Sequence, residues 1–130
     1  MLGEQRMSKS THPSTVWADI KKQIEFAIID GTYKNACKMP SIAEVAEIYS
    51  CGKSTAQKVL EEMYNEGIIT KQKGVGYFVK PFVREKLLEK YMNVWETELN
   101  HSIKEAYLLG VDIKTLESII VDKIKTIYSR

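Results

Sequence analysis

The chain has 130 residues, of which 44% are hydrophobic and 28% are charged, a composition typical of an ordinary folded protein rather than a disordered one. Lysine and arginine number 19 against 17 aspartates and glutamates, a formal net charge of +2. A nucleic-acid partner must therefore be argued from where the charges lie. No apolar run is long enough to span a membrane, and the polar residues 1–14 are unlike a secretory signal. We expect a cytoplasmic protein with no membrane partner.

Cysteines and histidines are too few and too scattered for a metal site or a nucleophilic active site. The chain contains Cys37, Cys51, His12 and His101, and none of them has a partner at metal-ligand spacing. We therefore expect no metal, no cofactor and no enzymatic activity. Cys51 precedes a predicted helix, whose dipole would lower the thiol pKa and suit a redox sensor. The alternative is that Cys51 fills a core position.

The first half of the chain predicts three helices after a flexible tail at residues 1–13. The first helix opens near Ser14 or Thr15, both good N-caps, and stops at Gly31. The second begins at the S-x-x-E capping box of Ser41 and Glu44. After a turn at residues 50–52, a third helix runs over residues 53–65. Its predicted inner face consists of Ala56, Val59, Leu60 and Met63.

The second half predicts a β-hairpin and then two helices. β-branched and aromatic residues over 68–72 and 77–80 flank a glycine-containing turn. Beyond Pro81, apolar residues recur at helical spacing from Phe82 up to Gly110, and Asp112 can cap a last helix. Two helices joined by such a short turn form an αα-hairpin.

This order of elements is that of a winged helix-turn-helix followed by a helical tail. We expect a mainly α protein with a small β-hairpin, divided into a winged helix-turn-helix domain at residues 14–81 and a helical dimerisation domain at 82–130. In such a unit the third helix enters the major groove of DNA and the hairpin, or wing, reaches the backbone or minor groove.

The candidate DNA-binding residues lie at the start of the third helix and around the wing tip. Polar side chains there can meet phosphates, and Gln57 can pair with adenine in the major groove. Three glutamates, Glu61, Glu62 and Glu66, are expected at the far end of the helix, away from DNA. The predicted DNA-contacting set is Ser41, Lys53, Ser54, Thr55, Gln57, Lys58, Lys71, Lys73, Gly74 and Gly76.

The helical tail carries more apolar side chains than two helices can bury alone. A second copy would cover them, and a two-fold dimer would present two recognition helices to a pseudo-palindromic operator. The alternative is a monomer whose tail folds back on the first helix. The predicted dimer face is Leu87, Tyr91, Trp95, Leu99, Ile103, Leu116, Ile120 and Ile124. A small-molecule effector of unknown identity is a further candidate partner, with Tyr91, Trp95, His101 and Tyr107 as candidate contacts.

Residues 16–79 resemble the GntR family of bacterial transcriptional regulators. The resemblance lies in four spaced motifs, which are Pro40-Ser41-x-x-Glu44-Val45-Ala46, Lys53-x-Thr55, Leu60-x-x-Met63-x-x-Glu66-Gly67-Ile68-Ile69 and Gly74-x-Gly76-x-Phe78-Val79. The short tail, from Glu85 to Leu116, resembles that of the YtrA subfamily. The resemblance implies a homodimeric, sequence-specific DNA-binding regulator held by its tail helices, and we expect a repressor.

Several positions depart from the family pattern. Ala43, Lys53 and Gln57 stand where the family commonly has arginine, Tyr77 replaces a usual threonine or serine, and Asn35-Ala36 replaces Pro-Gly. Because arginine and lysine are not equivalent at bidentate sites, the usual operator sequence is not expected. These departures leave a second hypothesis open, a winged-helix module that binds a protein instead of DNA.

Overall fold

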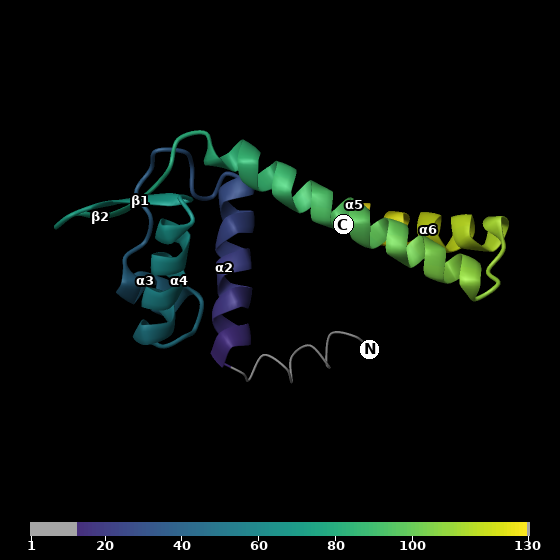
Figure 1. Ribbon diagram of the computed structural model, residues 1–130, viewed down its shortest axis with the longest axis horizontal. Helices are drawn as coiled ribbons and strands as arrows, with labels where there is room; N and C mark the ends of the chain where they lie inside the picture. Colours follow the sequence, from purple (N-terminus) through teal and green to yellow (C-terminus); the bar gives the residue numbers. More distant parts are fainter. Residues whose placement is uncertain (1–12, 130) are drawn as a thin grey trace. The chain divides into compact units, whose positions relative to one another are not determined.

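The computed structural model describes residues 13–129, and the expected flexible tail lies outside them except for its last residue. Figure 1 shows the element order, which is the predicted one. The elements are α2 (Pro13–Ile29), α3 (Ile42–Ile48), α4 (Lys53–Asn65), β1 (Ile69–Gln72), β2 (Gly76–Val79), α5 (Val83–Leu108) and α6 (Ile113–Tyr128). They form two compact units, one reaching Glu89 and the other beginning at Lys90.

Helix α2 begins at Pro13, so Ser14 and Thr15 lie inside the helix and the prediction that one of them is the N-cap is wrong. Proline suits the first helical position because that position has no intrahelical partner for an N–H group. The helix ends at Ile29, and Gly31 follows it with a φ of 91°, the left-handed conformation expected just beyond a helix C-terminus.

The predicted capping box at the start of α3 is confirmed. The amide of Glu44 donates to Ser41 Oγ at 3.2 Å, and the amide of Ser41 donates to Glu44 Oε1 at 2.9 Å. Two N–H groups that the helix cannot satisfy internally thus find acceptors. Helix α4 then starts after Gly52, so the connection is short enough to set the two helices at the steep angle of a helix-turn-helix.

The core of the first unit lies where α4 packs against α2 and α3. The four residues predicted for the inner face of α4 are all 0% exposed, as expected for a helix with one apolar side. The rest of the core comes from α2, α3, the loop before α3, the hairpin with the residue before it, and the first turns of α5. The core comprises Ile20, Ile24, Ile28, Met39, Val45, Ala56, Val59, Leu60, Met63, Ile68, Ile69, Tyr77, Val79, Val83 and Leu87.

The predicted hairpin is a two-stranded antiparallel sheet in which Ile69 pairs with Val79 and Gln72 pairs with Gly76. The loop before α3 extends this sheet by one bridge, between Lys38 and Phe78. Val79 and Ile69 are buried at the base of the hairpin, whereas the residues from Gln72 to Val75 at its tip are exposed. The hairpin is therefore anchored at one end and open to solvent at the other.

The boundary between the units lies inside α5 and not at Pro81. Val83 and Leu87, in the first two turns of α5, are buried in the core of the first unit. Arg84 Nε also donates to the carbonyl oxygen of Ile29 at 2.7 Å. These contacts move the domain boundary expected after residue 81 to residue 89. Leu87, predicted for the dimer face, is only 4% exposed, which corrects that assignment, because a side chain buried in its own chain cannot cover a partner.

The second unit is a helical hairpin with little burial of its own. Helix α6 reverses direction after α5 in Figure 1, and Asp112 is its N-cap residue, as predicted. No residue of α6 is buried. Large apolar side chains stay open along both helices, with Trp95 53% exposed and Ile124 49% exposed. The unit thus lacks a filled core within one chain.

Candidate nucleic-acid interface

The start of α4 presents most of the predicted groove-facing residues to solvent. Lys53, Ser54, Gln57 and Lys58 are exposed, and Thr55 is half-buried. They surround the N-terminus of a helix of 13 residues, where free amides and the helix dipole favour phosphate. Ser41 is also exposed, but its hydroxyl already accepts the amide of Glu44. The Ser41 side chain therefore caps the N-terminus of α3.

Gln57 is joined to a carboxylate on the same exposed side of α4. Gln57 Nε2 donates to Glu61 Oε2 at 3.0 Å. Residues four apart lie one above the other on a helix, so Glu61 shares the side of α4 that carries Gln57. Glu61, expected at the end of the helix away from DNA, is therefore in direct contact with one of the predicted DNA-contacting residues.

Lys58 rests on an aromatic ring from another helix. Its Nζ lies 5.0 Å from the centroid of the Trp17 ring in α2, a distance at which a cation is attracted to the face of an indole. The ring restrains a long side chain that would otherwise be free. The ammonium of Lys58 is therefore held over a ring that belongs to α2.

The wing carries the other two predicted lysines. Lys71 and Lys73 are both exposed, and Lys71 Nζ lies 5.7 Å from the ring centroid of Tyr77. The Tyr77 ring in turn meets Tyr64 of α4 edge-on, with the ring centroids 6.5 Å apart. This contact joins the wing to α4, and through Tyr77 it links Lys71 to that helix.

The two wing glycines are needed for backbone reasons. Gly74 has a φ of 77° and Gly76 a φ of 138°, conformations that L side chains rarely adopt. A Cβ atom at Gly76 would also come within 3.2 Å of Lys38 Cε. Both residues therefore shape the turn that carries Lys73.

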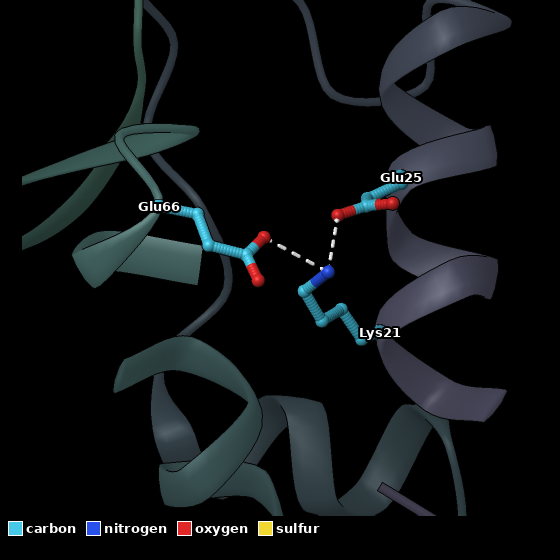
Figure 2. A network of polar contacts seen from close by, with 3 residues as sticks. All are labelled: Lys21, Glu25 and Glu66. Carbon is cyan, nitrogen blue, oxygen red and sulfur yellow. Dashed lines mark ion pairs between the residues drawn. The ribbon is translucent and has the colours of Figure 1, made fainter. Parts of the chain in front are cut away.

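An ion network that sequence reasoning missed joins α2 to the end of α4. Lys21 Nζ lies 2.9 Å from Glu25 Oε2 and 2.9 Å from Glu66 Oε1 (Figure 2). Glu25 is 0% exposed, and the cost of burying a charge is offset only by close partners. Burial alone would lower the pKa of Lys21, but the hydrogen bonds with Glu66 and Glu25 outweigh it and raise the pKa above 10.5. Lys21 is thus a positively charged clamp between the two helices.

Cys51 does not have the surroundings of a reactive thiol. It is half-buried against the core, and burial raises the pKa of its thiol. The prediction that the dipole of α4 lowers this pKa is therefore wrong. A raised pKa leaves less thiolate, which is the reactive form, and the alternative that Cys51 fills a core position is the better one.

The remaining predicted dimer residues all lie in the second unit, and all are open to some degree. Tyr91, Leu116 and Ile120 are half-buried, and Trp95, Leu99, Ile103 and Ile124 are exposed. Of the candidate effector contacts, Tyr107 is 80% exposed and His101 Nε2 lies 3.6 Å from Glu105 Oε2.

Within residues 13–129, no helix is both long and apolar enough to cross a membrane.

Known proteins resemble the chain over both units. Residues 17–79 match the sequence model of the gntR family of bacterial regulatory proteins. The HTH-type transcriptional repressor YtrA of Bacillus subtilis (strain 168) is 28% identical over 101 residues, which are 78% of each protein.

Two solved structures share the fold. A GntR family transcriptional regulator from Listeria monocytogenes has a TM-score of 0.66 at 22% identity, covering 82% of this chain and 93% of that one. A transcriptional regulator from Oenococcus oeni has a TM-score of 0.69 at 19% identity, covering 84% and 90%. The exposed polar helix, the wing and these similarities agree. Residues 17–79 thus form a domain of the gntR type of bacterial regulatory proteins, and the chain as a whole is similar to the transcriptional repressor YtrA.

Proposed function

We propose that the protein is a homodimeric, cytoplasmic, sequence-specific repressor that inserts α4 into the major groove and lays its wing on the DNA backbone or minor groove. The observation that carries this proposal is the exposed polar side of α4, which begins with Lys53 and Ser54 and continues through Gln57. The apolar side of the same helix is fully buried. A helix that is held by one side and polar on the other can enter a groove about 12 Å wide.

The residues divide into base-reading and phosphate-binding groups. Gln57 is the candidate base reader, because a carboxamide can both donate to and accept from adenine in the major groove. Lys58, Lys71 and Lys73 are candidate phosphate contacts, since ammonium groups favour phosphates and such contacts position a protein without reading sequence. Lys53 adds a cation at the helix N-terminus, where the helix dipole already attracts anions.

Dimerisation through the second unit is supported by the apolar side chains that one chain leaves open. Trp95, Leu99 and Ile103 on α5 repeat at steps of four, and Ile120 and Ile124 on α6 do the same. Exposed apolar area of this extent is unusual in a monomer. A two-fold dimer would bring two recognition helices to half-sites about one helical turn of DNA apart. The repressor role follows the name of the YtrA relative, and a small-molecule effector remains part of the hypothesis.

Fluorescence anisotropy with the DNA upstream of the protein's own gene tests the proposal. We expect tight binding with two chains per duplex, weaker binding to a scrambled duplex, and a steep loss of affinity as salt rises. Replacing Gln57 by alanine should lower the preference for the specific duplex and cost about 1–3 kcal/mol of binding free energy. Equal, weak binding of the wild type to both duplexes would contradict the proposal and favour a protein partner.

A further inference from the structure

Among the residues on the exposed side of α4 is an acidic one that the proposed DNA contacts do not use. Residues spaced three and four apart share a side of a helix, and Glu61 follows Gln57 by four and Lys58 by three. Glu61 is exposed, and its Oε2 is 3.0 Å from Gln57 Nε2. Its position is therefore set by a direct contact with the candidate base reader.

The Glu61 carboxylate limits which groups of DNA this side of α4 can contact. It is repelled by the phosphates, so it weakens binding wherever it meets the backbone. At a base edge it finds a partner only where an amino group points into the major groove, and the N4 amino group of cytosine is the one that glutamate accepts from. Glu61 thus favours one base and disfavours the backbone.

The lysine nearest to Glu61 on this side of α4 is engaged elsewhere. Lys58 stands three residues before Glu61, at a spacing that would allow an ion pair on a helix surface. Its Nζ lies instead 5.0 Å from the ring centroid of Trp17. The contact of the carboxylate is with the carboxamide of Gln57, and the carboxylate oxygens can accept further hydrogen bonds.

We propose that Glu61 is a specificity-determining residue that selects cytosine by accepting a hydrogen bond from its N4 amino group, next to the base read by Gln57. The proposal rests on the proposed insertion of α4 into the major groove. Four residues of α-helix span about 6 Å and base pairs are about 3.4 Å apart. The cytosine therefore lies one or two base pairs from the base that Gln57 reads. Gln57 keeps its second N–H and its Oε1 for that base while it holds the Glu61 carboxylate.

The first test compares base preferences of three forms of the full chain. Wild type, Glu61→Ala and Glu62→Ala are each used to select duplexes from a randomised DNA library, which is then sequenced. Glu62 is the matched control, because it is the next residue on the same helix, lies half-buried and gives the same change in charge. We expect wild type and Glu62→Ala to share a cytosine preference of about tenfold at one position. Glu61→Ala removes the hydrogen-bond acceptor and should lose this preference.

The second test removes the hydrogen-bond donor from DNA instead of the acceptor from the protein. N4-methylcytosine keeps its Watson–Crick pair but replaces the amino hydrogen that points into the major groove by a methyl group. Placed at the selected position, it should weaken wild-type binding about tenfold and leave the affinity of Glu61→Ala unchanged. Circular dichroism of each variant checks that the helices are retained.

Two results would overturn the proposal and leave the proposed function standing. One is that Glu61→Ala, which has no side-chain acceptor, selects the same bases as the wild type. The other is that N4-methylcytosine leaves the DNA affinity of the wild type unchanged, while Glu61→Ala alters only the preference for the base read by Gln57. Glu61 would then orient the Gln57 side chain without contacting a base itself. If the wild type selects no sequence at all, the proposed function itself fails, and that outcome is distinct from both.

Discussion

The ammonium of Lys58 in α4 lies 5.0 Å from the centroid of the Trp17 ring in α2. The contact joins a candidate phosphate-binding side chain to the helix that supports it. An exposed cation–π contact contributes about 0.5–1 kcal/mol, which is small for stability. Its larger effect is to limit the positions that Lys58 can occupy, so that less side-chain entropy is lost on binding DNA.

Charge and restraint at Lys58 can be separated by two substitutions. Lys58→Ala should weaken binding to all duplexes alike and lower the slope of log affinity against log salt by about 1, because one phosphate contact is lost. Trp17→Leu keeps the charge, so affinity should fall by a smaller factor while the slope stays the same. Anisotropy titrations over a salt series measure both, with Lys114→Ala on α6 as the control. A change of base preference in Lys58→Ala would contradict the assignment to phosphate.

Replacing Lys21 by methionine should destabilise the first unit by about 3 kcal/mol, because the buried carboxylate of Glu25 loses its ammonium partner. Glu66→Gln should cost less than about 1 kcal/mol, since the Glu66 side chain is 43% exposed and exposed ion pairs contribute little. Urea unfolding measures both values. Because the folded state raises the pKa of Lys21 above 10.5, the ion network stabilises the folded state below that pH, and this stabilisation is lost as the pH rises further. The difference in free energy of unfolding between wild type and Lys21→Met should therefore become smaller above pH 10.5.

Ala36 holds a left-handed conformation in the loop before α3, with a φ of 66°, and its amide donates to the carbonyl of Val79 at 2.9 Å. A residue with a Cβ pays about 1 kcal/mol in that region. Ala36→Gly should therefore raise the free energy of unfolding by about 0.5–1 kcal/mol. Ala43→Gly, in the helical backbone of α3, is the control and should lower it by about 1 kcal/mol. Thermal or urea unfolding that ranks the two variants the other way would refute this reading of the loop.

A charged residue introduced on the predicted dimer face should dissociate the dimer into monomers. Leu99→Glu on α5 places a carboxylate among apolar side chains, and we expect a monomer by analytical ultracentrifugation at concentrations where the wild type is a dimer. Helix content should be retained in the first unit. Asn100→Glu, one residue further on, is the control for the added charge. If Leu99→Glu sediments as a dimer, as the wild type does, this face is not the dimer interface.

Cys37 and Cys51 should react with iodoacetamide at different rates. Cys37 is exposed, whereas Cys51 is half-buried and its thiol pKa is raised by burial. At pH 8 less of Cys51 is thiolate, so it should be alkylated more slowly. Mass spectrometry of peptides over a time course gives both rates. Faster labelling of Cys51, with loss of DNA binding, would revive the redox-sensor hypothesis.

Local features of the fold were predictable because their causes lie within a few residues of chain. The capping box of Ser41 and Glu44, the bounds of α4 and its buried face all follow from side-chain chemistry and helical spacing. The start of α2 is less predictable, since Ser14 and Thr15 are good caps but Pro13 also suits a first helical position, and the helix begins at Pro13.

The sequence by itself determined which side of each helix is apolar, and with it the order of elements and the polar side of α4. Only the tertiary structure decided which partner each side meets. Periodicity marks Leu87 as an inward residue, but the core it enters is that of the first unit. In the same way, the contacts of Lys58 with Trp17 and of Lys21 with Glu66 join residues about 40 positions apart. Spacing along one helix carries no information about such pairs, because they depend on how separate helices pack.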